Sequence, residues 1–509
     1  MFSKYVTNGL AVILLCLSFT SCKKFLDERP SKGSSVVIKT TSDLNALLNG
    51  YATFFKESDN VAIYGSDDNG MSTAIYNARP SFFSSSIVQF SLWDIPNLPI
   101  TDQSNFSGTN FWTAEYTKVF NANLVLANLD AVTGTEAEKA SLKADAHFIR
   151  AYSYWQLANT YCLPYSEATK GEPGLPLKVL PDYEPVGRGT LEATYQQIEA
   201  DVNAALQTTV PLVQNGVAKH WRANIAAANG FAARFYLHKS DYTKALQYAN
   251  AALAHYNTVV DYNTGMRHGT PVVVTVGGVP TTIQVPYTYD KPVNFDPADA
   301  LGWKEFLYYR ILSNSSSWYI PSQSLLSLYD TAKDLRYKYH MVQNYSYLRS
   351  FTNPAFSYPG YVFFGNDGIP EGPTTAEMVL IKAECLARTN DVAGAMTAIN
   401  GLYVKRMKTG TPPLTAATQD AAITEILKER RRELPFSQRW FDIRRFNSNS
   451  YAADDVSLSK VFYPYTANAV QATQPVQTYT LPKGSRRFAS PLPQTDVDFS
   501  NGQIPQNIY

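Results

Sequence analysis

Residues Ile423 to Arg445, ITEILKERRRELPFSQRWFDIRR, combine an apolar helical stripe with a dense set of charges. Arg430 falls on the stripe itself, and Glu433 lies three residues further along the same helix surface. A buried arginine costs several kcal/mol unless it is paired, so this segment must bring carboxylates to it. The apolar positions recur with the spacing of one helix face; they are Ile423, Ile426, Leu427 and Leu434.

We therefore predict a structural clamp in which Arg430 is buried and paired with Glu433, with Asp442 beyond the break at Pro435, or with a carboxylate from a distant helix. Trp440 would be its apolar anchor. A catalytic or anion-binding cluster is the alternative use of the same charges.

The same stretch resembles a family signature. ERRRELPFSQRWFDIRR is similar to the C-terminal signature of the SusD/RagB family of Bacteroidetes surface lipoproteins, in which an ERR-x-EL run precedes RWFD. Two more segments agree with this resemblance: CKKFLDERP at Cys22 to Pro30, and the arginine–aromatic helix around Arg150 to Tyr154.

The N-terminus has the pattern of a lipoprotein signal. Lys4 precedes an apolar run from Leu10 to Phe19, which is too short for a stable membrane-spanning helix. Small residues then lead directly to Cys22, which predicts a signal peptide over residues 1–21, lipidation of Cys22 and a lipidated tether over 22–40. An ordinary secretory signal with an incidental cysteine is the alternative.

The charge balance argues against nucleic acid as a partner. Lys4 is the only charged side chain before Cys22, so the rest of the chain carries 43 basic and 43 acidic residues. A neutral chain of this kind lacks the basic surface that phosphate backbones require. We expect residues 41–509 to form a single helical domain.

Two segments have the spacing of tetratricopeptide helix pairs. In 227–253 and again in 378–402, small residues mark the helix contacts and an acid, Asp241 or Asp391, marks the turn between the helices. Two unrelated helical hairpins are the alternative. With the resemblance, these patterns predict an all-α, tetratricopeptide-like fold decorated with long irregular loops and a β-hairpin at 272–285.

Two loop-rich regions, about 57–110 and 257–375, interrupt this scaffold. Both are rich in aromatic residues, and the 34 tyrosines of the chain suit a surface that stacks on ligands. We expect a shallow ligand-binding surface built from both regions, on rings flanked by polar residues. The candidates are Trp93, Asn97, Trp318 and Tyr319, with Tyr76 and Arg79 as weaker additions.

The resemblance implies a non-enzymatic, surface-exposed outer-membrane lipoprotein. Such a protein would bind an oligosaccharide, or a peptide in the RagB branch, and deliver it to a SusC-like TonB-dependent transporter. An α-helical glycoside hydrolase is the alternative of another class, because paired carboxylates need only be close in space.

The sequence contains no motif that indicates a metal site, a cofactor or a catalytic nucleophile. The six histidines are scattered without metal-ligand spacing, and neither a P-loop nor a nucleophile elbow occurs. The most suggestive acidic pair is Asp67-Asp68, and its polar loop favours turn formation or an ion-binding edge.

Overall fold

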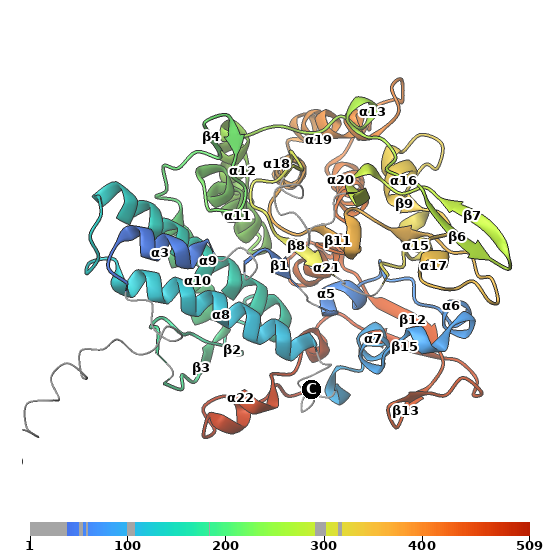
Figure 1. Ribbon diagram of the computed structural model, residues 1–509, viewed down its shortest axis with the longest axis horizontal. Helices are drawn as coiled ribbons and strands as arrows, with labels where there is room; N and C mark the ends of the chain where they lie inside the picture. Colours follow the sequence, from blue (N-terminus) through green and yellow to red (C-terminus); the bar gives the residue numbers. More distant parts are fainter. Residues whose placement is uncertain are drawn as a thin grey trace, which may run out of the picture.

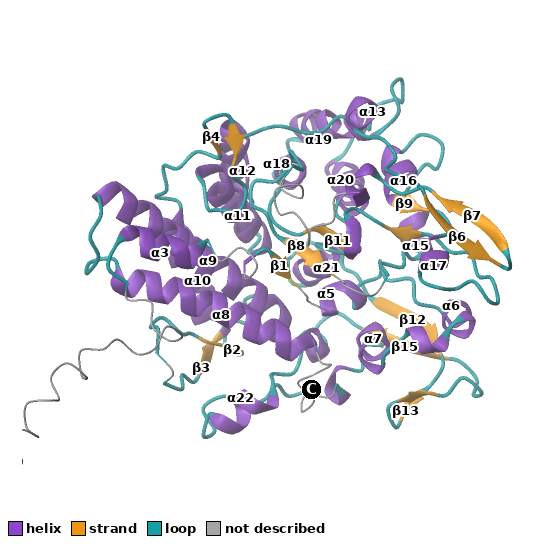
Figure 2. Cartoon of the chain, viewed as in Figure 1, coloured by secondary structure: helices purple, strands orange, loops and turns teal. Residues whose placement is uncertain are grey.

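The computed structural model describes residues 38–49, 54–57, 60–98, 107–182, 184–290, 302–313 and 318–509 (Figure 1). Helices dominate these residues, and the strands form two-stranded pairs and one short three-stranded sheet (Figure 2). The fold class is the one predicted. The predicted signal peptide, Cys22 and nearly all of the tether lie outside the described residues.

The first part of the scaffold consists of three long helices and a short one. Helices α8 (Ser107–Asn128), α9 (Glu136–Tyr161) and α10 (Leu191–Ala205) pack side by side, and α3 (Thr41–Leu48) covers α8 and α9. A capping box sets the start of helix α9. Glu138 N donates to Thr135 Oγ1, and Thr135 N donates to the Glu138 carboxylate.

The two helix pairs predicted from the repeat spacing form as expected. The first is α11 (Ile225–His238) with α12 (Tyr242–His255), and the second is α18 (Thr375–Arg388) with α19 (Val392–Arg406). The turn acids cap the second helix of each pair, because Asp241 accepts from Lys244 N and Asp391 accepts from Gly394 N. Although they are far apart in sequence, the pairs pack against each other through α12 and α18.

The C-terminal charged stretch forms two helices, α20 (Gln419–Glu433) and α21 (Arg439–Phe446), which are separated by a break that contains Pro435. Helix α20 packs on α18 and α19, and α21 contacts α5 (Asn60–Tyr64) from the first loop region. The end of the chain thus reaches both the scaffold and the loops.

The first loop region is less irregular than predicted. It contains α5, α6 (Thr73–Ala78), the 3₁₀ turn η1 (Pro80–Phe82), α7 (Ser85–Ser91) and η2 (Ile95–Asn97). These helices are too short to show a periodicity, and serine side chains cap two of them: Ser72 accepts from Ile75 N, and Ser84 accepts from Ile87 N.

The second loop region contains the predicted hairpin, β6 (Val272–Val276) and β7 (Val279–Ile283), with short helices such as α15 (Gln323–Leu326) and α17 (Tyr345–Leu348). Its strand β8 (Ile311–Ser313) pairs in parallel with β1 (Lys56–Glu57) from the first region. Outside both regions, β12 (Leu458–Phe462) and β15 (Gln477–Leu481) form a further antiparallel pair. The sequence analysis predicts neither the β1–β8 pair nor the β12–β15 pair, because no short turn joins the partner strands in either.

Most of the aromatic residues pack inside the molecule. The largest apolar cluster joins rings from α9 and α11 to rings of both loop regions. The abundance of tyrosine and tryptophan therefore serves the core more than the sequence analysis assumed, and exposed rings are the minority that a ligand could reach.

Candidate functional site

The two loop regions are joined to each other through their backbones. Gly70 N donates to Ile320 O at 2.8 Å, and Ser322 N donates to Asp68 O at the same distance. A Cβ at Gly70 would lie 2.5 Å from Pro321 O, so only glycine permits this approach. The two loop regions therefore lie side by side at these residues.

The joined loops are fastened to the C-terminal helices by two aspartates, which we call the aspartate latch. Arg439 Nε donates to Asp67 Oδ1 at 2.7 Å, and Arg431 Nε donates to Asp68 Oδ1 at 2.8 Å. Asp68 Oδ2 also accepts from Phe436 N. Asp67 and Asp68 lie in a turn closed by Asn69 N donating to Ser66 O, as expected, and their carboxylates pair with arginines rather than forming an ion-binding edge.

The two carboxyls of the latch differ in their electrostatics, because the pKa of Asp67 is lowered whereas complete burial raises the pKa of Asp68. Burial opposes the charge on Asp67, but Arg439 and then Arg431 outweigh it and lower the pKa of this carboxyl to about 2. The side chain of Asp68 is fully buried, so it is reached by protein groups and not by solvent. The ion pair between Asp67 and Arg439 consequently holds the base of the loops at neutral pH.

Next to the latch lies the Arg430 pair. Arg430 is 1% exposed, and its Nε donates to Asp442 Oδ2 at 2.7 Å. Trp440 is fully buried against Phe488, with ring centroids 5.1 Å apart. Glu433, the other expected partner of Arg430, instead accepts from Arg406 and Arg336 at 2.7 and 2.9 Å.

The strongest ring candidates from sequence lie in the core. Trp93, Trp318 and Tyr319 are each 1% exposed. Trp93 Nε1 donates to Gly65 O, and Tyr319 Oη donates to Leu312 O, so their polar atoms are also satisfied internally. The expected exposure of these three rings is wrong, because protein covers the faces on which a ligand would stack.

The remaining candidates, Tyr76, Arg79 and Asn97, are nearer to solvent. Tyr76 is half-buried and packs on Phe83, Phe462 and Tyr463. Arg79 is also half-buried, and it donates to Arg349 O across the two loop regions while lying 5.9 Å from the Phe82 ring. Asn97 is exposed and donates to Asp94 Oδ1 at 2.8 Å.

A continuous set of rings connects Tyr76 to the second loop region. It runs from Tyr463 through Tyr76, Phe83 and Phe82 to Trp318 and ends at Tyr358, with neighbouring centroids 5.3 to 6.4 Å apart. Four members of this set are half-buried, and we call them the ring surface: Tyr76, Phe82, Tyr358 and Tyr463.

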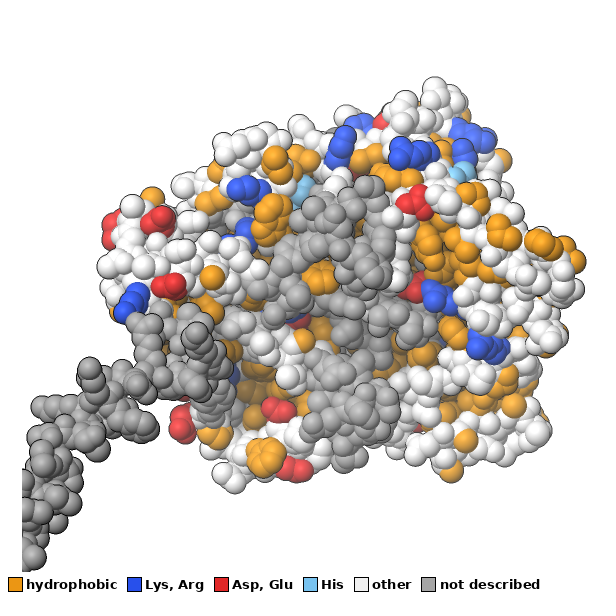
Figure 3. Space-filling view, viewed as in Figure 1, with side chains coloured by type: hydrophobic (Ala, Val, Ile, Leu, Met, Phe, Trp, Pro, Cys, Tyr) orange, Lys and Arg blue, Asp and Glu red, His pale blue; other side chains and the backbone are white. Residues whose placement is uncertain are grey.

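Amides border the ring surface. Asn77, which is exposed, donates to Tyr463 Oη at 2.7 Å, and Gln323, also exposed, donates to Tyr358 Oη at 3.1 Å. Burial raises the pKa of Tyr358, which keeps this phenol protonated at neutral pH. Figure 3 shows the side of the molecule that carries α6 and the β6–β7 hairpin as hydrophobic side chains among uncharged groups, with few charges.

Sequence reasoning missed Phe82, Tyr358 and Tyr463. Tyr463 follows β12, outside both predicted loop regions, so only the fold brings it to Tyr76. Phe82 stands in the segment Pro80–Phe82, where the flanking proline and serines are the one signal that could have separated it from core rings.

Within the described residues, no cluster of three or more histidine, cysteine or acidic side chains has the geometry to hold a metal ion. None of the helices found there is both long and apolar enough to cross a membrane. Cys162 and Cys385 are both buried and unpaired with each other.

These observations define a helix-pair scaffold that carries a ring-lined loop surface. Comparisons with known proteins show the same scaffold in one family. A family described as "Starch-binding associating with outer membrane" matches residues 24–237, and one described as "SusD family" matches residues 374–509. The chain belongs to the SusD/RagB family.

A SusD-like protein from Formosa agariphila is 26% identical over 236 residues, which cover 44% of this chain and 42% of that protein. The chain thus matches less than half the length of this curated relative.

Solved structures share the fold over nearly the whole chain. A SusD superfamily protein from Bacteroides thetaiotaomicron matches with a TM-score of 0.64 and 17% identity, over 92% of this chain and 100% of that one. A sugar-binding protein from Bacteroides vulgatus matches with a TM-score of 0.61 and 18% identity, over 93% and 99%. A laminarin-binding SusD-like protein matches with a TM-score of 0.56 and 17% identity, over 92% and 99%.

Proposed function

We propose that the protein is a lipid-anchored outer-membrane protein that binds an oligosaccharide on the ring surface and delivers it to a SusC-like TonB-dependent transporter. The observation that carries this proposal is the pairing of half-buried rings with exposed amides at the junction of the two loop regions. Family membership supports it, since one matching family is described as starch-binding and outer-membrane-associated.

The chemistry of the ring surface suits a sugar. Sugar rings present apolar C–H faces that can lie on Tyr76, Phe82, Tyr358 or Tyr463, and hydroxyls that can pair with amides at the edges. Asn77 and Gln323 each have further donor and acceptor capacity beyond the single bond made to a tyrosine.

We propose binding without turnover. Glycoside hydrolysis commonly needs two carboxyl groups that flank the scissile bond, one of them able to give a proton. The acidic pair of the first loop region, Asp67 and Asp68, is bonded to arginines at the base of the loops. That arrangement supports a structural use of these carboxylates.

The anchoring half of the proposal rests on sequence. Cys22 directly follows a short apolar run, which is the pattern of a lipidated N-terminus, and such an anchor would keep the binding surface at the membrane beside a transporter. Copurification of a SusC-like transporter with the full-length chain in mild detergent tests the partnership, and its absence would argue against it.

Calorimetry with maltoheptaose, laminarihexaose and a mixed peptide library tests the ligand class. Tyr358→Ala should weaken binding of the preferred saccharide by ~1–3 kcal/mol, by analogy with the loss of one aromatic stacking partner. Tyr248→Ala, a half-buried tyrosine on α12, is the matched control and should bind like the parent.

Three outcomes would change the proposal. Equal affinity of Tyr358→Ala and the parent would remove the ring surface as the site. Binding of peptide but no saccharide would favour the RagB-like function. Release of reducing ends from a bound saccharide would favour a hydrolase.

A further inference from the structure

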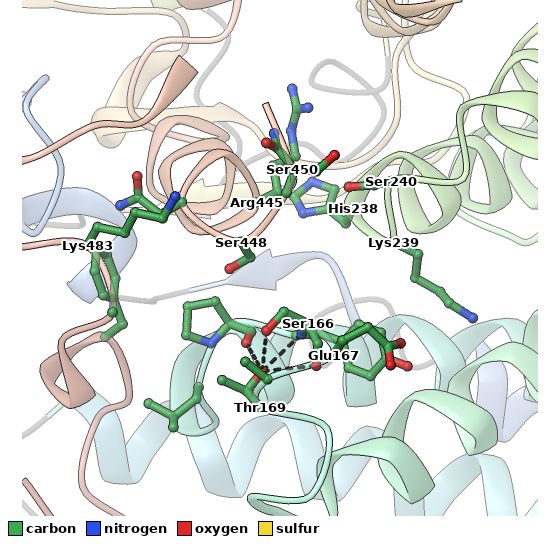
Figure 4. A pocket seen from close by; sticks show the side chains of 18 of the residues that line it. Ser166, Glu167, Thr169, His238, Lys239, Ser240, Arg445, Ser448, Ser450 and Lys483 are labelled. Carbon is green, nitrogen blue, oxygen red and sulfur yellow. Dashed lines mark hydrogen bonds between the residues drawn. The ribbon is translucent and has the colours of Figure 1, made fainter. Parts of the chain in front are cut away.

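A second pocket lies away from the ring surface, where the helix pairs meet the C-terminal segment (Figure 4). Its volume is about 610 Å³, and it shares no lining residue with the ring surface. Four segments build it: the loop after α9 (163–169), the end of α11 with its turn (238–240), the end of α21 and the residues after it (445–450), and the turn around 483–488. A volume of this size suits a small-molecule ligand, whose pockets span roughly 300–1,000 Å³.

The charged side chains that line this pocket are neutralised within the protein. Lys239 pairs with Glu199 at 2.5 Å, Lys483 pairs with Asp455 at 2.7 Å, and Glu167 pairs with Lys170 at 2.6 Å. Arg445, which is buried, forks onto Glu384 at 2.6 and 2.8 Å. The pocket therefore does not present an unpaired charge that would select an ion.

The histidine in the lining is also uncharged at neutral pH. His238 is buried, and its burial, reinforced by the cation of Arg445, holds the pKa of the imidazole well below its ordinary value. Asp442, the acid that faces it, acts in the opposite direction, while Arg430 and Arg234 add to the lowering. The ring packs edge-on against Trp155, with centroids 5.2 Å apart.

Hydroxyl groups are the prevailing polar feature of the wall. Figure 4 shows Ser448 on one side and Ser166 with Thr169 on the other, facing the same space, while Lys239 and Lys483 stand toward its two ends. Ser448 Oγ donates to Arg444 O and Thr169 Oγ1 donates to Pro164 O, so these two hydroxyls offer acceptor lone pairs to the hydroxyls of a polyol. The hydroxyl-bearing residues of the lining are Ser166, Thr169, Ser240, Ser448, Ser450 and Ser485.

An aromatic ring completes the wall. Tyr165 lines the pocket and stacks on Tyr195 with centroids 4.1 Å apart and 18° between the planes. The ring is half-buried, with one face covered by Tyr195. The exposed part of such a ring offers an apolar contact to the C–H side of a sugar.

Side-chain bonds hold the wall in place. The Asn447 side chain makes two hydrogen bonds to the backbone of Val456. Nδ2 donates to Val456 O at 2.9 Å, and Oδ1 accepts from Val456 N at 2.8 Å. On the other side, Thr169 Oγ1 donates to Pro164 O at 2.6 Å and contacts Ser166 Oγ at 3.0 Å. A pocket that is already formed binds without the ordering cost that a mobile one would carry.

We propose that this pocket is a second binding site for a neutral, hydroxyl-rich ligand, namely a single sugar unit or the end of a short oligosaccharide. Identification of the ligand as a saccharide rests on the proposed function, whereas the location and the neutral chemistry rest on the pocket itself. With two sites, one saccharide chain or two separate ones can be held by the same molecule.

A single-cysteine protection experiment tests the second site. Ser450 is exposed and lines the pocket, so Ser450→Cys in a chain that also carries Cys16→Ala and Cys22→Ala places one accessible thiol there. Cys162 and Cys385 are buried and burial raises the pKa of both thiols, so they react slowly with maleimide. Thr397→Cys, exposed on α19 and outside every site described, is the matched control.

Maltoheptaose or laminarihexaose at about ten times its Kd should slow alkylation of Ser450→Cys about tenfold, and leave Thr397→Cys unchanged. The protection should persist when Tyr358→Ala is added, because that residue belongs to the ring surface. Ser448→Trp, which fills the pocket, should weaken binding at this site while leaving binding at the ring surface intact.

Each of the other possible results refutes either the second site alone or the second site together with the proposed function. Saccharide binding seen by calorimetry with no protection of Ser450→Cys removes the second site and leaves the proposed function standing. Protection that vanishes with Tyr358→Ala means one site and refutes the separate pocket. Absence of both binding and protection with either saccharide refutes the second site and the proposed function together.

Discussion

The pair formed by Arg430 and Asp442 makes an asymmetric prediction about stability. Asp442 accepts from two arginines, Arg430 at 2.7 Å and Arg445 at 2.8 Å. Arg430 has Asp442 as its one partner within hydrogen-bond distance, and Glu377 lies 3.9 Å from its Nη2. Arg430 Nη1 and Nη2 are buried without a hydrogen-bond partner in the described protein. Removal of the acid therefore strands a buried charge, whereas removal of the base does not.

We expect Asp442→Ala to lower the free energy of unfolding by ~3–5 kcal/mol, the cost of an uncompensated buried charge. Arg430→Ala should cost less, ~1.5–3 kcal/mol, because Asp442 keeps Arg445 and only one charged hydrogen bond is lost. The double variant should cost less than the sum of the two, since Arg430 is no longer stranded once it is absent.

Urea unfolding of the lipid-free chain, followed by tryptophan fluorescence, measures these differences. Lys428→Ala is the control on the same helix: Lys428 pairs with Glu425 at 2.8 Å but is 46% exposed, so its loss should cost ~0–1 kcal/mol. Arg430→Ala as costly as Asp442→Ala, or strictly additive single variants, would refute the asymmetry.

Three further predictions follow from other parts of the molecule. Burial opposes the charge on Glu433, but Arg406 and Arg336 outweigh it and lower its pKa from 4.5 to about 2. The stabilising contribution of Glu433 is complete above about pH 4.5 and is lost as the pH falls toward 2. Glu433→Gln should therefore flatten the acid-unfolding curve in that window, and an unchanged curve would contradict the pairing. Trp318→Ala should destabilise the fold by ~3–5 kcal/mol as a core truncation, and a thermal melt like that of the parent would show that the ring is not needed for packing. Cys22→Ala should leave the chain unlipidated and in the soluble fraction after cell lysis, and continued membrane association with no partner present would argue against the anchor.

The helical scaffold could be predicted from sequence because its signals are local. Helix α9 contains the expected arginine–aromatic segment around Arg150 to Tyr154, and the two helix pairs were recognisable from small residues and turn acids. These features depend on neighbours within one or two turns, which a single sequence displays directly.

The exposed rings could not be identified, because burial in a loop depends on distant partners. Trp93 and Trp318 are flanked by polar residues in sequence, yet Gly65 O and the rings of Phe82 and Phe351 enclose them. The latch is hidden in the same way, since 363 residues separate Asp68 from Arg431. No local pattern reports a contact across that distance.

The aspartate latch has a consequence for how this surface can change over time. The ion pairs of the latch and the Gly70 contact hold the base of the two loop regions. The half-buried rings of the ring surface take no part in those bonds. Tyr358 Oη donates to Pro321 O beside the Gly70 contact, so under the proposed function it is substitution of Tyr463 that would alter what is recognised without loosening the base of the loops. Such a division lets a lineage exchange one nutrient for another by replacing a few side chains, while the architecture beneath is inherited intact.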